Sequence, residues 1–154
     1  MSAVKVPIAL VEDQPGLRAE IGFHLALAGY AVAELPHWQP WHHATGAAHG
    51  AAFCNADGDI LLAREDVGRH NALDKLVGRL SRTGRLGEAG FVVLSSRGSH
   101  ELVRKCAKVG IAALATISAP TAMGVQMAEL IGLRFWGLCR PPQAVLYAPG
   151  AQSA

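Results

Sequence analysis

Hydrophobic and polar residues follow one another along the chain with two different spacings, and each change of spacing marks a predicted element. From Ala44 onward, short apolar runs typical of buried strands are separated by segments whose apolar residues recur at helical spacing. Strands are predicted at 49–55, 59–64, 91–94, 111–117, 133–138 and 144–147, and helices at 99–109 and 120–131. This alternation predicts an α/β fold with a mixed, largely parallel sheet and helices on its faces.

One further helix is predicted in the stretch from Glu65 to Gly78, directly after the second strand. Asp66 is a candidate cap for it, and an apolar stripe at i, i+3, i+4 and i+7 is made by Leu73, Leu76, Val77 and Leu80. The two strands before this helix flank Ala56-Asp57-Gly58, in which Asp-Gly accepts the positive φ angles of a tight turn. These two strands are therefore predicted to form a hairpin.

The N-terminal segment follows a different pattern. A strand from Val4 to Val11, a helix from Gly16 to Ala28 that ends at Gly29, and a strand from Tyr30 to Leu35 predict one strand-helix-strand unit. Residues 36–43 then hold two prolines, two tryptophans and three histidines without periodicity, which indicates a linker. The predicted division is a fragment at 1–35, a linker or seam at 36–43, a main domain at 44–150 and a tail at 151–154.

Composition excludes several classes of protein. The length of 154 residues suits one domain with its own core, and the net charge of +2, without a basic run, argues against a nucleic-acid binder. The three cysteines lie far apart and form no Cys-x-x-Cys, which argues against a disulfide framework and against a metal held by protein ligands. Without a signal-peptide pattern or an uninterrupted apolar span, the chain is predicted to be cytoplasmic and to make no membrane contact.

Candidate chemistry concentrates at the start of the Glu65 to Gly78 helix. Its polar residues are Arg69, His70, Asn71, Asp74 and Lys75, and the pairs His70/Asp74 and Asn71/Lys75 are predicted to meet because they are four residues apart. The free N–H groups of a first helical turn attract anions, and an arginine can pair a phosphate through two hydrogen bonds. The alternative is a solvated helix face whose ion pairs contribute little.

Two other strand ends carry similar polar stretches. These are Ser95 to His100, which includes Arg97, and Ser118 to Thr121. Because ligands bind outside the carboxyl ends of strands in open α/β sheets, the three corners are expected to share one crevice. Ser99 and Ser118 could each be a plain helix cap instead, and His49 is a weaker candidate for the same crevice. Cys54 and Cys106 are predicted to be core thiols. Cys139 beside Arg140 is the one candidate for a reachable thiol, and a structural role is the preferred interpretation there too.

Motifs exclude some enzyme classes. The chain has no His-x-Glu with Pro-Cys-x-x-Cys, as a zinc deaminase requires. It also has neither a Gly-x-x-x-x-Gly-Lys-Ser/Thr loop nor a Gly-x-Ser-x-Gly elbow.

The stretch EDVGRHNALDKLVG, with TGAAHGAAFCNADGDILLAR before it and SSRGSHELVRKCAKVGIAALATISAPTAMGVQMAELIGLRFWGLCRPPQAVLYA after it, closely resembles the C-terminal part of the formate dehydrogenase accessory sulfurtransferases, the FdhD family. The resemblance implies a cytidine-deaminase-like three-layer α/β/α fold. It implies a sulfur carrier that accepts sulfur from a cysteine desulfurase and serves formate dehydrogenase apoenzyme, usually as a homodimer. The implied client is the bis-molybdopterin guanine dinucleotide cofactor, and the family's cofactor-binding stretch falls on Leu138, Cys139, Arg140, Pro141, Pro142 and Gln143.

The chain departs from the family pattern at the residues that matter for sulfur transfer. The family carries sulfur on a Cys-x-x-Cys loop upstream of the Thr-Gly-x-x-His segment, whereas no cysteine precedes Cys54 here. Pro142 and Gln143 stand where relatives commonly have a glycine and a basic residue, and Gly98 stands where relatives usually have a larger apolar residue. We therefore expect cofactor binding without the persulfide-carrying cysteines.

Residues 1–35 resemble the start of a response-regulator receiver domain, with Glu12 and Asp13 in the place of its acidic pair. The phosphoacceptor Asp and the later Lys of a receiver have no counterpart. The leading expectation is thus a truncated accessory protein, joined to a receiver-like fragment, that retains the cofactor crevice around Arg69, His70, Asn71, Asp74, Lys75, Arg97 and Ser118. Two alternatives are a non-catalytic binding or signalling module and a degenerate fusion product without function.

Overall fold

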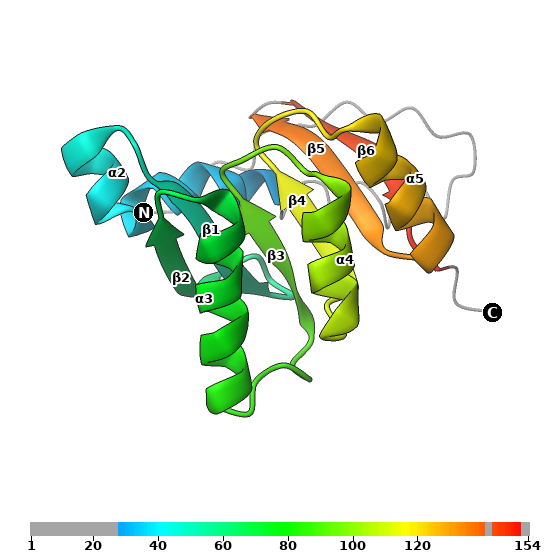
Figure 1. Ribbon diagram of the computed structural model, residues 1–154, viewed down its shortest axis with the longest axis horizontal. Coiled ribbons are helices and arrows are strands. Elements are labelled where there is room, and N and C mark those ends of the chain that lie inside the picture. The colour runs from blue at the N-terminus through cyan, green and yellow to red at the C-terminus, as the bar shows by residue number, and fades with distance from the viewer. Residues whose placement is uncertain (1–27, 141–142, 152–154) are drawn as a thin grey trace.

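The fold is a six-stranded mixed sheet between two layers of helix, seen in the computed structural model (Figure 1). The structure describes residues 28–140 and 143–151. In chain order its elements are η1 (Leu35–Trp38), α2 (Pro40–Thr45), β1 (His49–Asn55), β2 (Ile60–Asp66), α3 (Arg69–Arg82), β3 (Gly90–Leu94), α4 (His100–Lys108), β4 (Ala113–Thr116), α5 (Ala122–Ile131), β5 (Arg134–Arg140) and β6 (Gln143–Pro149). Within this part of the chain, no helix has the length and apolar character needed to cross a bilayer.

The strand order is β2-β1-β3-β4-β5-β6. The β3–β4 and β4–β5 pairs are parallel, whereas β1–β2, β1–β3 and β5–β6 are antiparallel. The mixed sheet is confirmed, but the prediction that it is largely parallel is wrong, because two of the five strand pairs in the described part of the chain are parallel and these lie at its centre. The predicted hairpin is β1–β2, where Gly58 has a φ of 90° and the Asn55 side chain accepts the N–H of Asp57 and Asp59.

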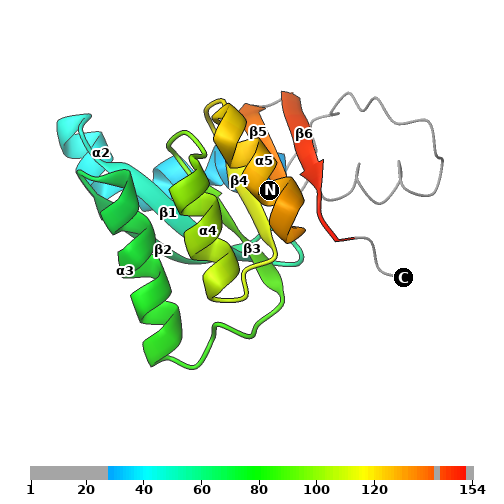
Figure 2. The same cartoon turned by 45° about the vertical axis from the view of Figure 1, so that its right-hand side comes forward.

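Helices α3, α4 and α5 cover one face of the sheet (Figure 2). Leu73, Leu76 and Leu80 of the predicted stripe are fully buried there, together with Leu102 and Val103 of α4 and Ala128 of α5. The opposite face packs against the segment that contains residues 28–35, through Trp136, Phe91 and Val93 of the sheet. Two separate apolar layers, one on each face, give the predicted three-layer arrangement.

The predicted strand from Tyr30 to Leu35 is wrong, because residues 28–34 are helical and continue into η1. Ala28, Ala31, Val32 and Leu35 are all buried, and their spacing is that of one helix face. The alternation of small and large residues in this segment imitated the period of a strand. Gly29 consequently lies inside the helix and does not end it. The predicted elements between residues 1 and 27 lie outside the described residues.

The predicted linker at 36–43 is also ordered into short helices. Gln39, between η1 and α2, is only 3% exposed, and its side chain lies over Gly50 of β1. A Cβ atom on Gly50 would stand 2.6 Å from the end of the Gln39 side chain, so a larger residue there would require that side chain to move. The segment therefore packs on the main sheet.

Candidate functional site

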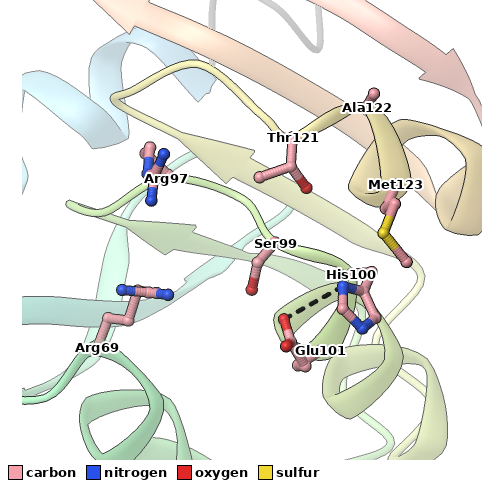
Figure 3. Close-up of a pocket in the computed structure, with 8 residues that line it drawn as sticks. All are labelled: Arg69, Arg97, Ser99, His100, Glu101, Thr121, Ala122 and Met123. Atoms are coloured by element: carbon pink, nitrogen blue, oxygen red, sulfur yellow. Dashed lines mark ion pairs between the residues drawn. The ribbon is translucent and has the colours of Figure 1, made fainter.

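The carboxyl ends of β2, β3, β4 and β5 and the first turns of α3, α4 and α5 all meet at one edge of the sheet. A cleft of about 330 Å³ opens at this edge between the three helices (Figure 3). Its lining consists of Arg69, Arg97, Ser99, His100, Glu101, Thr121, Ala122 and Met123. The predicted convergence of the three polar corners is thus seen, since each of them contributes at least one residue.

Arg69 reaches the cleft because β2 passes into α3 through a turn that Asp66 organises. The Asp66 carboxylate accepts the N–H of Gly68 at 2.9 Å, and Gly68, in an extended conformation, is the residue before the helix. The predicted cap at Asp66 is therefore wrong in position: its side chain shapes the turn, and the N-cap is Gly68. Arg69 is the first residue of α3, and its Nε atom is buried without a hydrogen-bond partner.

The loop from Ser95 to Gly98 positions the second part of the cleft. Ser95 accepts the N–H of Gly50 at 2.8 Å, which ties the loop to β1. Gly98 packs so closely on the sheet that a Cβ atom there would stand 2.2 Å from Cζ of Phe135. Ser99 is the N-cap residue of α4, as predicted, but its hydroxyl caps no N–H, and its Oγ is buried without a partner in hydrogen-bonding geometry.

The third wall is the start of α5. The Thr121 hydroxyl accepts the N–H of Gly124 at 3.0 Å and caps the helix. Thr121 N–H in turn donates to Gly98 C=O at 3.0 Å, so the α4 and α5 loops are held together. Ser118, the predicted alternative cap, is four residues before the helix and does not line the cleft.

The electrostatics of the cleft are dominated by two arginines. Within the described residues, neither Arg69 nor Arg97 takes part in an ion pair. The Glu101 carboxylate is the acidic group of the cleft, and its pKa is lowered by the nearby Ser99 hydroxyl, by its own backbone N–H and by His100 and His70. Nδ1 of His100 stands 3.4 Å from this carboxylate.

His49 lies beside the cleft at the start of β1. Burial, together with the positive charge of Arg69 and the neighbouring His42, lowers the pKa of its imidazole. Neutral imidazole is thus favoured there, and the weak prediction for His49 corresponds to a position next to the site and outside its lining.

The remaining polar residues of α3 have partners elsewhere. Lys75 forms an ion pair with Asp66 at 2.5 Å and stands 5.3 Å from the ring centre of Trp41, and Asn71 donates to Asp66 at 3.2 Å. The Glu65 carboxylate accepts the N–H groups of Trp41 and His42, both at 2.9 Å. We call Trp41, Glu65, Asp66, Asn71 and Lys75 the anchor cluster, since it fixes α2 to the β2–α3 corner.

Neither predicted i, i+4 pair forms a direct hydrogen bond or ion pair among the described residues, although Asn71 and Lys75 meet at the Asp66 carboxylate. Asp74 forms its ion pair with Lys105 of α4, at 2.7 Å, and not with His70; Lys75 reaches back to Asp66 and not to Asn71. Long side chains near the first turn of α3 find acidic partners on neighbouring elements, and these contacts replace those along the helix. Of the five predicted residues on α3, the cleft lining includes Arg69, while His70 lies near enough to Glu101 to influence its pKa.

The stretch of the family's cofactor-binding residues begins at the end of β5. Leu138 has a φ of 52° and is 38% exposed, and its N–H donates to Ser118 C=O at 3.3 Å. Arg140 pairs with Gln143 across the start of the β5–β6 hairpin, and Pro141 and Pro142 lie outside the described residues. The described residues of this stretch adjoin the cleft edge of the sheet and are not among the residues that line the cleft.

All three thiols are buried. Burial raises the pKa of Cys54, Cys106 and Cys139 to about 12 each, with Asp59 adding to the shift at Cys54 and a backbone contact from Thr116 opposing it at Cys139. The structural role preferred for Cys139 is confirmed, and the alternative of a reachable thiol is not, since its side chain is 0% exposed and points into the layer beneath the sheet. A thiol that stays protonated and buried is a poor nucleophile.

Three lining residues were not singled out from the sequence: Glu101, Ala122 and Met123. Glu101 follows a serine cap and resembles an ordinary first-turn acid. Met123 is 59% exposed at the first turn of α5, where an apolar residue was expected to be core. Only the approach of α4 to α5 brings these side chains together, and no local pattern encodes it.

Comparisons with known proteins agree with this architecture. The model of the FdhD/NarQ family matches residues 9–153. The chain is 53% identical over 117 residues to the sulfur carrier protein FdhD of Chromobacterium violaceum, covering 76% of this chain and 43% of that protein. It is 47% identical over 144 residues to the FdhD of Burkholderia cenocepacia, covering 91% and 52%.

A solved structure shares the fold. It is the crystal structure of a protein assigned as a formate dehydrogenase accessory protein from Desulfotalea psychrophila, with a TM-score of 0.73 and 29% identity over 80% of this chain and 53% of that one. The chain thus spans about half the length of the relatives that it matches. The family match begins at residue 9 and includes most of the predicted receiver-like fragment, while the division at 36–43 stays a prediction. From residue 9 to residue 153, therefore, this chain belongs to the FdhD/NarQ family.

Proposed function

We propose that this chain is the cofactor-binding part of a sulfur carrier protein that serves the maturation of formate dehydrogenase. Its client is the bis-molybdopterin guanine dinucleotide cofactor, bound at the sheet edge between the cleft and the β5–β6 turn. Family membership supports the process, and the matched relatives are named as sulfur carriers. The partners in this proposal are formate dehydrogenase apoenzyme, a cysteine desulfurase and a second copy of the chain.

The observation that carries the proposal is the pair of arginines in the cleft. Arg69 and Arg97 line the cleft from two different elements, and neither forms an ion pair in the part of the chain that the structure describes (Figure 3). A guanine dinucleotide carries a diphosphate, and arginine pairs phosphate oxygens through two parallel hydrogen bonds. A cleft of about 330 Å³ is also within the size range of small-ligand sites.

The proposal assigns no sulfur-carrying role to the thiols of this chain. Cys54, Cys106 and Cys139 are buried and keep their protons at neutral pH. A persulfide donor requires an accessible thiolate. The chain is therefore expected to hold the cofactor while sulfur comes from a cysteine outside it.

Binding of a guanine nucleotide tests the first half of the proposal. Isothermal titration calorimetry of the purified chain with GDP is expected to give saturable binding, and ADP is expected to bind more weakly. Arg82→Gln is a control for charge alone, because it removes one arginine charge at the far end of α3, away from the cleft. Its affinity for GDP should equal that of the parent chain. No heat of binding at millimolar GDP would contradict the proposal.

Sulfur loading tests the second half. After incubation with a cysteine desulfurase and cysteine, mass spectrometry of the native chain is expected to show no added sulfur on any cysteine. The same chain unfolded in urea should react with a thiol reagent at all three positions, which verifies that the thiols are intact. A stable persulfide on native Cys139 would overturn this half.

A further inference from the structure

The positions of the hydrogen-bond donors around the cleft say more about its ligand than its net charge does. Arg69 comes from the first turn of α3, and Arg97 from the loop before α4 (Figure 3). Two lysines of the neighbouring helices are paired with acids: Lys75 with Asp66 and Lys105 with Asp74. Among the described residues that line the cleft, Arg69 and Arg97 are the arginines, and neither takes part in an ion pair.

Backbone and hydroxyl donors add to the arginines. The first hydrogen bond within α4 runs from Val103 N–H to Ser99 C=O, so the N–H groups of residues 100–102 have no partner within the helix. Ser99 is 7% exposed, and its Oγ is buried without a partner in hydrogen-bonding geometry at the wall of the cleft. Arg69 Nε is a second buried donor without a partner. Such a set of donors suits a group with several acceptor oxygens.

Glu101 places its carboxylate among these same donors. It is the second residue of α4, stands 3.4 Å from His100 and faces the Ser99 hydroxyl (Figure 3). The Ser99 hydroxyl, although it forms no hydrogen bond of good geometry, is the first cause that lowers the pKa of Glu101, and the backbone N–H of Glu101 is the second. An incoming anion must therefore compete with this side chain.

We propose that the cleft seats a diphosphate group between Arg69 and Arg97 over the first turn of α4, and that the Glu101 carboxylate competes with it for the donors of that turn. This inference deepens the proposed function, since it assigns the diphosphate of a nucleotide-type ligand to this cleft and not to the β5–β6 turn. The two arginines then bind the diphosphate, and competition from Glu101 keeps the affinity for it lower than the arginines alone would give. The ligand can therefore dissociate readily.

Inorganic pyrophosphate is the probe that tests this seat without a nucleoside. Titration calorimetry or ³¹P NMR on the full chain is expected to show saturable binding. Arg69→Gln and Arg97→Gln should each weaken it by about 10- to 100-fold, the usual loss for a charge-assisted pair. Arg97→Lys should recover only part of this loss because a lysine cannot make the two parallel bonds. Arg82→Gln should change binding by less than about twofold.

Glu101→Gln gives the opposite and more diagnostic effect. It removes the competing charge and should tighten pyrophosphate binding several-fold, whereas Glu129→Gln on the exposed side of α5 should not. Melting curves of every variant verify folding. The inference is overturned if both arginine variants bind pyrophosphate like the parent chain, or if Glu101→Gln fails to tighten binding.

Comparison with GDP separates this inference from the proposed function. If pyrophosphate binding depends on the two arginines but GDP binds no better than pyrophosphate, the diphosphate seat stands and guanine-nucleotide recognition fails. If GDP binds and the arginine variants leave its affinity unchanged, the proposed function stands and the diphosphate lies elsewhere, which contradicts the seat.

Discussion

Two polar regions adjoin at the start of α3, and they differ in how their charges are satisfied. In the anchor cluster each charge has a partner within the chain: Asp66 has Lys75 and two further donors, and Glu65 has two backbone N–H groups. In the cleft, Arg69 and Arg97 have no ion pair among the described residues. Arg69 and Lys75 are only six positions apart, yet Arg69 lines the cleft whereas Lys75 pairs with Asp66 at the β2–α3 corner.

The comparison shows that the density of polar residues does not identify a site. Ion pairs and caps formed inside the chain make the anchor cluster structural, and cations without internal partners make the cleft a candidate for binding. If this distinction is right, changes in the cluster should affect stability and leave anion binding unaltered. Changes at the cleft arginines should weaken anion binding and leave stability unaltered.

The largest expected effect on stability is at the base of the cleft. Gly98→Val would place side-chain atoms against the Phe135 ring, and overpacking of this kind costs about 1–3 kcal/mol. Urea unfolding should detect this loss, and Phe135→Leu in the same chain should recover part of it. Gly87→Ala is the matched control, because nothing lies within 4 Å of its added Cβ. Equal effects at Gly87 and Gly98 would contradict the close packing.

A smaller effect is expected at the anchor cluster. Glu65→Gln replaces the carboxylate that accepts the Trp41 and His42 N–H groups, so unfolding should become easier by about 1 kcal/mol. Hydrogen exchange of these two amides should accelerate. Pyrophosphate affinity should stay within about twofold of the parent chain. A large loss of pyrophosphate binding would show that the two regions are coupled.

The Asp66 ion pair should give stability a dependence on pH. Lys75 and the Gly68 N–H lower the pKa of Asp66 to about 2, against 3.8 without these contacts. A lowered folded-state pKa stabilises the fold above pH 4 and loses that effect as pH falls through 2. The melting temperature of Asp66→Asn should thus lie below the parent value at pH 6 and approach it near pH 2. If the difference in melting temperature between the two chains were the same from pH 6 to pH 2, the ion pair would not be the cause of that difference.

The smallest effect on stability is expected at the cleft itself. Arg97 is exposed and forms no ion pair in the described part of the chain, so Arg97→Gln should change the unfolding free energy by less than about 0.5 kcal/mol. Chemical denaturation of both chains provides the measurement. A marked loss of stability in Arg97→Gln would show that Arg97 has a structural role, like the residues of the anchor cluster.

The main domain was predictable from sequence because its local signals agree with its packing. The Leu73, Leu76 and Leu80 stripe gives α3, Asp57-Gly58 gives the hairpin, and Gly110 and Gly132 follow α4 and α5 with positive φ angles. The strand prediction for Tyr30 to Leu35 was wrong because the alternating alanines fit the period of a strand as well as that of a helix. Only burial against Trp136 decides between them.

The site was predictable only in part. Arg69 and Arg97 could be found because they lie at the ends of strands that share one edge of the sheet. Asp74 and Lys75 looked equivalent in sequence, but their partners, Lys105 and Asp66, depend on how α3 sits against α4 and β2. Glu101 could not be distinguished from an ordinary first-turn acid until the cleft around it was defined.

Leu138 gives the end of β5 a property of its own. It has a left-handed backbone without being glycine, at a point where the β5–β6 register shifts between Gly137 and Arg140. This conformation costs an ordinary residue about 1–2 kcal/mol, and the hydrogen bond from its N–H to Ser118 offsets part of that cost. The end of β5 is therefore a point where a non-glycine residue in the left-handed region interrupts the regular β5–β6 ladder.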